Sequence, residues 1–326
     1  MNRHPVPWPQ AWQEALYGPD GFYRGADGPV RHFSTSATGI PHADAVMARA
    51  VVALARRQRR STVVDLGAGR GSLIGQVARA APDLRCVGVD VVPAPATLPD
   101  GVDWWVGAGG EHLPPQVDTC TGALVVAHEW LDVVPTTVAR RDAAGVWRAG
   151  EVDVRTGQES FDTAVSEEER VWLETWTDAD TIVAEVGLTR EHALAELYGH
   201  LHESSVLVVD YGHVASQRPV EGSLVGYRQG EVQRPLPDGS MDLTAHVAMD
   251  ALCASMGQDV LVRARQSEIL GDLIGPAHVD QRWARSRPAA YLQQVAEHAA
   301  AHALSQRGGL GDFWWVLIEP PARLSR

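Results

Sequence analysis

The sequence contains no lysine, because all 28 basic residues among its 326 are arginine. This absence excludes lysine Schiff bases, pyridoxal-phosphate lysines and the lysine of a P-loop. Cysteine is scarce as well, since only Cys86, Cys120 and Cys253 occur, far apart and without a C-x-x-C pair. We therefore expect buried thiols in a reducing compartment and predict no metal site.

Long apolar runs and an excess of positive charge are also missing. No hydrophobic stretch reaches the ~18 residues of a membrane-spanning helix, and residues 1–10 lack the apolar centre of a signal peptide. The formal net charge of −13 argues against nucleic acid or an anionic membrane as a partner. We expect a soluble, cytoplasmic protein with one large domain that carries an insertion.

The most informative stretch that is present is 61–71, where an apolar strand runs into Asp65 and a glycine-rich turn leads into an amphipathic helix. Its glycines are Gly67, Gly69 and Gly71. Glycine allows positive φ and close approach of a ligand, and the N-terminus of the helix offers free N–H groups. Ser72 stands where the dinucleotide fingerprint needs its third glycine. The turn therefore favours a nucleoside without phosphates, such as S-adenosylmethionine, over the nucleotide of an oxidoreductase.

A second acid supports this interpretation. The next apolar strand, residues 84–90, ends in Asp90, about 20 residues beyond the glycine turn. In a doubly wound sheet an acid at this position can hold both ribose hydroxyls. Asp90 is therefore predicted to bind the ribose.

The chain alternates strands and helices from residue 61 onward. Strands are expected near residues 62–66, 85–90, 102–106, 121–127, 205–211, 258–264 and 313–319. Residues 1–60 are predicted to form an N-terminal cap and helix, and residues 61–326 a cofactor-binding domain. Within that domain we expect a hairpin over 133–154, helical insertions over about 165–203 and 266–304, and helices over 243–256 and 283–304. The pattern predicts an α/β fold with a mostly parallel, doubly wound sheet.

Two acids follow the fourth expected strand. Glu129 and Asp132 flank Trp130 at the edge of the sheet where ligands bind. If the turn is helical, both carboxylates lie on one face and can hold a planar guanidinium through paired hydrogen bonds. The alternative is a helix N-terminus that favours acids for electrostatic reasons. Asp210 ends a later strand, either facing the substrate or shaping a turn, and Asp242 is expected to cap a helix that carries His246.

Taken together, these motifs and several others resemble those of the MidA-like methyltransferases, which include the mitochondrial complex I assembly methyltransferase. The matching segments are Gly21–Tyr23, Phe33–Ser36, Asp65–Gly71, Ala127–Pro135 (AHEWLDVVP), Val208–Gly212, Gly222–Arg228, Asp242–Val247 and Gln266–Leu270. Ala37 and Thr38 depart from the proline and glutamate usual in that family.

The resemblance implies a class I methyltransferase, Rossmann-like fold with S-adenosyl-L-methionine as cofactor and a protein arginine as acceptor. The catalytic residues are predicted to be Glu129, Asp132, Asp210 and His246. The predicted cofactor contacts are Thr35, Ser36, Asp65, Gly67, Ala68, Gly69, Gly71, Asp90, Val91, Glu111, His112, Ala127 and His128.

Other interpretations remain open at the level of sequence. The acceptor could be a small molecule or a peptide made by a biosynthetic cluster. The chain could instead be an assembly factor that binds S-adenosylmethionine without turning it over. A homodimer is compatible with the sequence.

Overall fold

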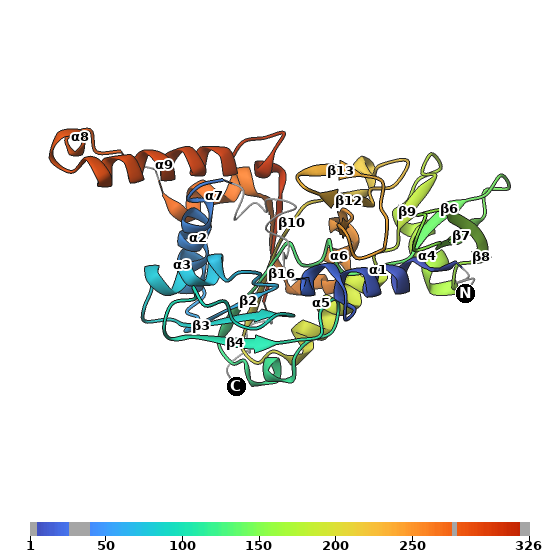
Figure 1. Ribbon diagram of the computed structural model, residues 1–326, viewed down its shortest axis with the longest axis horizontal. Helices are drawn as coiled ribbons and strands as arrows, with labels where there is room; N and C mark the ends of the chain where they lie inside the picture. The colour runs from blue at the N-terminus through green and yellow to red at the C-terminus, as the bar shows by residue number, and fades with distance from the viewer. Residues whose placement is uncertain (1–4, 26–39, 276–278, 320–326) are drawn as a thin grey trace.

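The computed structural model describes residues 5–25, 40–275 and 279–319. A seven-stranded sheet and a five-stranded sheet lie toward opposite ends of the long axis, and helix α1 (Trp8–Tyr17) lies between them (Figure 1). The structure is therefore a mixed α/β fold with a seven-stranded large sheet, a five-stranded sheet called the small sheet below, and two further sheets of two and three strands.

The large sheet has the strand order β16-β17-β10-β5-β2-β3-β4. Its strands are β2 (Thr62–Leu66), β3 (Arg85–Asp90), β4 (Val102–Val106), β5 (Ala123–His128), β10 (Ser205–Asp210), β16 (Val260–Arg265) and β17 (Trp314–Ile318). Neighbouring strands from β10 to β4 pair in parallel, whereas β17 runs antiparallel to both β10 and β16. The seven strands expected from the sequence are confirmed to within a few residues at each end.

Helices cover both faces of the large sheet, so its central strands are apolar on both sides. Alternate residues of β5, Leu124 and Val126, pack on one side with α2 (Ala43–Arg57), α3 (Ser72–Ala80), α7 (Gln266–Ile274) and α9 (Pro288–Leu304). The intervening residues Val125 and Ala127 pack on the other side with α5 (Leu188–His200) and α6 (Met249–Met256). The short α8 (Trp283–Ser286) precedes α9.

The small sheet is built from segments that lie between β5 and β10, together with the start of the chain. It has the order β1-β7-β6-β9, with β8 paired to β7. Its strands are β1 (Val6–Pro7), β6 (Val138–Arg141), β7 (Trp147–Val152), β8 (Glu159–Ala164) and β9 (Val183–Glu185). Strands β6 and β7 form an antiparallel hairpin, and α4 (Glu167–Trp176) follows β8. The wholly helical insertion expected over 165–203 is therefore wrong at β9, a three-residue strand that depends on pairing with β6.

The helix expected over 243–256 is also wrong in its first part. Strand β14 (Asp242–Thr244) pairs with β12 (Val225–Arg228), which also pairs with β13 (Glu231–Gln233). Strand β15 (Val247–Ala248) pairs with β11 (Gly212–His213), and α6 begins only at Met249. Asp242 is consequently no helix cap. Tertiary strand pairing has overridden the local helical preference of this segment.

Helix α1 connects the five-stranded sheet to strand β14 through its tryptophans. Trp8 and Trp12 are fully buried. The indole N–H of Trp8 donates to Glu159 Oε1 (2.7 Å), and that of Trp12 donates to the Leu243 carbonyl (3.0 Å). The remaining short 3₁₀ turns are η1 (Phe22–Arg24), η3 (Pro115–Thr119), η4 (Ala215–Gln217), η5 (Gly257–Asp259) and η6 (Leu310–Asp312).

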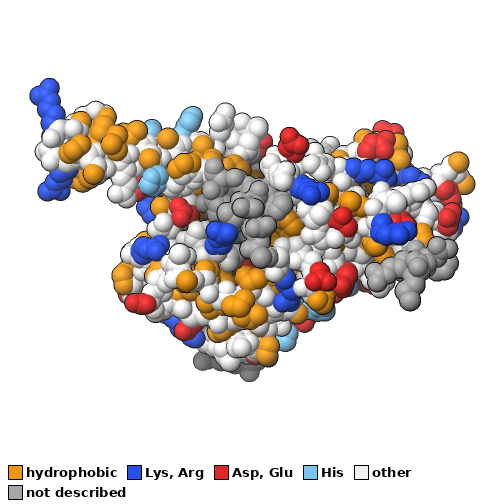
Figure 2. All heavy atoms as spheres, viewed as in Figure 1, with side chains coloured by type: hydrophobic (Ala, Val, Ile, Leu, Met, Phe, Trp, Pro, Cys, Tyr) orange, Lys and Arg blue, Asp and Glu red, His pale blue; other side chains and the backbone are white. Residues whose placement is uncertain are grey.

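Among the described residues, no helix combines the length and apolar character needed to cross a bilayer, and no cluster of metal-binding side chains occurs. Cys86 and Cys120 are buried, and Cys253 is half-buried in α6; all three are unpaired thiols. On the face shown in Figure 2, acidic and arginine side chains are interspersed, so this face carries no single basic patch.

Candidate functional site

The glycine turn after β2 exposes its backbone. Gly67, Gly69 and Gly71 have φ values of 75°, 57° and 67°, the left-handed region that glycine adopts without strain. A Cβ added at Gly67 or Gly69 would meet no atom of a described residue within 4 Å, whereas one at Gly71 would lie 2.5 Å from the Leu98 side chain. The first two glycines therefore leave an open cradle for a ligand, and the third is required by packing.

Asp90 ties the end of β3 to this turn. Its Oδ2 accepts the Gly69 N–H (2.7 Å), and its Oδ1 accepts the N–H groups of Val91 (2.7 Å) and Val92 (3.3 Å). Burial raises the pKa of Asp90, and these three N–H groups and then Arg24 oppose the rise. The carboxylate is thus fixed beside the cradle, with lone pairs left for hydroxyl donors.

Arg24, which sequence reasoning missed, braces the same edge from the N-terminal segment. Its guanidinium donates to the carbonyls of Tyr17 (3.0 Å), Val91 (3.3 Å) and Ala108 (3.2 Å). These carbonyls belong to α1 and to the loops after β3 and β4. Arg24 directly follows the Gly21–Tyr23 motif, and this position is the sequence feature that could have identified it.

Asp65 lies in β2 just before the glycine turn, and its side chain is buried. It is 3% exposed, and its pKa is raised to about 7, chiefly by burial and then by the negative charge of Asp90. A hydrogen bond from the Ile74 N–H opposes the rise. Asp65 therefore binds the first turn of α3 through the Ile74 N–H group.

The other expected cofactor contacts lie along the same sheet edge. Ala68 is half-buried beside the two open glycines, and Val91 and Ala127 are buried. Glu111 is half-buried and His112 exposed in the loop after β4, which Trp130 contacts by donating its indole N–H to Gly110 O (3.2 Å). Burial lowers the pKa of His128 to about 4, so its imidazole is neutral. Thr35 and Ser36 lie outside the described residues.

The turn over residues 129–132, here called the acidic turn, is not helical. Glu129 adopts a φ of 51°, in the left-handed region, and its N–H donates to Val209 O (2.8 Å). Asp210 is fully buried, and its Oδ2 accepts the N–H groups of Leu131 (3.0 Å) and Asp132 (3.2 Å). The expected placement of both acids on one helical face is therefore wrong. Asp210 holds the backbone of the turn in place.

Negative charge accumulates around the acidic turn. Asp132 is 3% exposed, and its Oδ1 accepts no hydrogen bond from any described residue. Burial and then the charge of Glu129 raise the pKa of Asp132 to about 7, against the opposing effects of Tyr211 and Arg190. Burial raises the pKa of Asp210 well above its ordinary value, and the charge of Asp132 adds to the rise. The site thus holds buried carboxylates whose mutual repulsion and burial outweigh the opposing charge of Arg190.

Tyrosines line the same region, and sequence reasoning assigned them no role. The Tyr23 hydroxyl donates to Asp242 Oδ1 (2.7 Å), and its ring lies 5.4 Å from that of Tyr17. Burial raises the pKa of Tyr23 and of Tyr211 well above the ordinary value, so both phenols are neutral donors. His246 is half-buried and packs edge-on against Tyr211, with 5.4 Å between ring centroids.

Arg190 is the cation packed against this cluster. It is 2% exposed on α5 and donates to four backbone carbonyls. Its acceptors are Asp132 O (2.9 Å), Val134 O (3.3 Å), Ala245 O (3.2 Å) and His246 O (2.8 Å). A lone arginine in a charged helix gives no sequence signal for this role.

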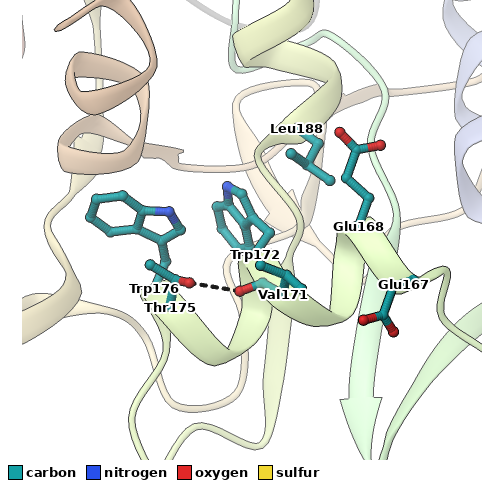
Figure 3. Close-up of a pocket in the computed structure, with 7 residues that line it drawn as sticks. All are labelled: Glu167, Glu168, Val171, Trp172, Thr175, Trp176 and Leu188. Atoms are coloured by element: carbon teal, nitrogen blue, oxygen red, sulfur yellow. Dashed lines mark hydrogen bonds between the residues drawn. The ribbon is translucent and has the colours of Figure 1, made fainter.

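A separate pocket of about 540 Å³ lies on α4, away from the acidic turn. It is lined by Glu167, Glu168, Val171, Trp172, Thr175, Trp176 and Leu188. Figure 3 shows the two indoles on the same side of α4, with Glu167 directed away from them. None of the predicted site residues lines this pocket.

The model of a family of S-adenosyl-L-methionine-dependent methyltransferases matches residues 91–265. A COG1565 superfamily member from Burkholderia thailandensis, crystallised with S-adenosyl-homocysteine, is 21% identical, covers 97% of this chain and 88% of its own, and has a TM-score of 0.75. A native crystal structure of a protein of that superfamily, also from Burkholderia thailandensis, gives 20% identity, 97% and 87% coverage, and a TM-score of 0.75. No curated protein matches the sequence. The two structures share the overall fold of this chain.

Proposed function

The chain belongs to this family of S-adenosyl-L-methionine-dependent methyltransferases, and we propose that it methylates an arginine or another nitrogen nucleophile of a protein or peptide. The MidA-like motifs support this choice of acceptor. The large sheet, with β17 antiparallel between β10 and β16, supports a class I, Rossmann-like layout for residues 61–326, with residues 1–60 as a cap.

The cofactor end of the site is assigned to the glycine turn and Asp90. The open backbone at Gly67 and Gly69 fits the methionine and sulfonium part, because no atom of the described residues lies within 4 Å of a Cβ placed at either glycine. Asp90, already fixed by three backbone N–H groups, accepts the ribose hydroxyls. When bound, S-adenosyl-L-methionine supplies the methyl group as an electrophile.

The observation that carries the choice of acceptor is the buried, unpaired Oδ1 of Asp132 beside Glu129. A buried carboxylate oxygen without a donor costs free energy until a ligand supplies one. A guanidinium supplies both a positive charge and parallel N–H groups that match a carboxylate. The excess negative charge around the acidic turn therefore favours a cationic acceptor.

The residues of the chain then have separate tasks. Glu129 and Asp132 orient the acceptor nitrogen and take up the proton that it loses on methylation. Trp130 and the neighbouring tyrosines exclude water from the reacting atoms. Asp210 holds the acidic turn, so the carboxylates are in position before the acceptor arrives.

Two measurements test this proposal. Calorimetry with S-adenosyl-homocysteine should show binding, and the absence of heat would contradict the cofactor assignment. Incubation of host lysate with isotopically labelled S-adenosylmethionine, followed by mass spectrometry, should then place label on arginine or another nitrogen of polypeptides. Label confined to small molecules would reassign the acceptor. Binding without any transfer would identify a cofactor-binding assembly factor.

A further inference from the structure

Arg190 stands out because it belongs to the insertion and yet bonds only to the site. It lies in the first turn of α5, whose helix begins at Leu188, and it is 2% exposed. Its acceptors are backbone carbonyls from two loops that are more than a hundred residues apart in sequence, Asp132–Val134 and Ala245–His246. One side chain therefore joins the segment that carries the acidic turn to the segment that carries His246.

The geometry requires a guanidinium. Arginine offers five N–H donors in a rigid plane, and here its Nε, Nη1 and Nη2 all donate. A lysine ammonium is a single point with three donors and cannot reach four carbonyls spread around a plane. The Trp12 ring, whose centroid is 5.8 Å from the guanidinium carbon, packs against the same group.

Arg190 also provides the positive charge for the acids of the site. The groups that interact with it electrostatically are Asp132, Asp210, Glu185, Tyr211, His213 and His246. Its charge opposes the rise in pKa of both Asp132 and Asp210. His213 and His246 have lowered pKa values, chiefly through burial, and so contribute no compensating charge at neutral pH.

We propose that Arg190 is the positioning residue for methyl transfer, through which the insertion helix α5 fixes the acidic turn against the segment that carries His246. The proposal rests on the function proposed above for the acidic turn. It assigns Arg190 two separable tasks, since its hydrogen bonds set the position of the turn and its charge sets the ionisation of Asp132 and Asp210.

Two variants separate these tasks. Arg190→Lys keeps the charge and loses the planar set of donors, whereas Arg190→Met loses both. The half-buried Arg170 of α4, which pairs with Glu167 and Glu174 at the surface, provides the matched control as Arg170→Met. Hydrogen exchange should be followed at the amides of Leu131, Asp132 and Ala245, all of which are bonded within this network.

Exchange at these amides should accelerate about tenfold or more in both Arg190 variants, because each variant loses charged hydrogen bonds that hold the acidic turn. Transfer to lysate polypeptides should fall about 100-fold in both, mainly in kcat, while S-adenosyl-homocysteine binds within about threefold of the wild type. The acid limb of the pH–rate profile should move to higher pH in Arg190→Met and stay in place in Arg190→Lys.

Wild-type exchange rates in Arg190→Lys would overturn the proposal, as would full rescue of turnover by lysine. If Arg190→Met does not fold, the hydrogen-exchange rates and the methyl-transfer rate of Arg190→Lys are sufficient to test the positioning role. If the wild type binds S-adenosyl-homocysteine but transfers no methyl group, the proposed function fails, and the exchange experiment still tests the positioning role.

Discussion

The two ends of the site are built in different ways. The cofactor end is made of backbone groups from contiguous motifs, namely the open glycines after β2 and the N–H groups that hold Asp90. The acceptor end is made of side chains from five separate segments, represented by Tyr23, Asp132, Arg190, Asp210 and Asp242. Backbone N–H groups thus hold Asp90 at the proposed cofactor end, whereas at the proposed acceptor end the Oδ1 atom of Asp132 accepts no hydrogen bond from a described residue. Under the proposed function, binding of the acceptor, and not of the cofactor, would relieve the electrostatic cost of burying Asp132.

The largest expected effect concerns that cost. Asp132→Asn should raise the free energy of unfolding by up to ~4 kcal/mol at about pH 8, because the wild-type pKa rises from 3.8 to about 7 on folding. Because the folded pKa is raised, the contribution of Asp132 to wild-type stability is fully present below about pH 4 and is lost as the pH rises through about 7. Urea unfolding across this range measures both. The exposed Asp162→Asn is the control, and parallel curves for wild type and Asp132→Asn would contradict the prediction.

At the cofactor end, Asp90→Ala should weaken binding of S-adenosyl-homocysteine about 100-fold or more, since two hydroxyl partners and the bond to the glycine turn are lost together. Glu129→Ala should leave this binding nearly intact. Calorimetry measures both, with the exposed Asp103→Ala as control. Equal losses in the two site variants would show that the two ends are not separate.

Glu129→Gln tests the acceptor end by removing charge without changing size. Turnover should fall about 10- to 100-fold, because a charge-assisted hydrogen bond to the acceptor is replaced by a neutral one. Methyl transfer into lysate polypeptides measures the loss. Glu174→Gln on the exposed face of α4 should have no effect, and an unchanged rate in Glu129→Gln would remove Glu129 from the mechanism.

The smallest expected effect concerns backbone strain. Glu129 and the exposed Glu203 both adopt left-handed conformations, with φ of 51° and 49°. Glycine at either position should raise the free energy of unfolding by up to ~1 kcal/mol. Only Glu129→Gly should lose methyl-transfer activity. Comparing it with Glu203→Gly therefore distinguishes backbone strain at the site from backbone strain at the surface. A destabilised Glu129→Gly would show that the side chain contributes more to folding than the strain costs.

The same contrast explains what the sequence could predict. Local patterns of apolar and turn residues mark the strands of the large sheet and the glycine turn, so the sequence predicts their positions. Strand β9 and the segment before α6 form only because distant strands pair with them, and short segments carry too little periodicity to reveal this. The sequence predicts that Glu129 and Asp132 act together, but the conformation of the turn that carries them depends on Asp210 and Arg190. Neither contact leaves a trace in the neighbouring sequence.

The burial of α1 has a consequence for synthesis of the chain. Its indoles at Trp8 and Trp12 bond to residues 151 and 231 positions later, so α1 leaves the ribosome well before the strands that it packs against. Until those strands emerge, its apolar stripe is exposed to water, and closing so long a loop is slow. Nascent chains that stop before Leu243 should therefore be the species most prone to aggregate and most dependent on chaperones.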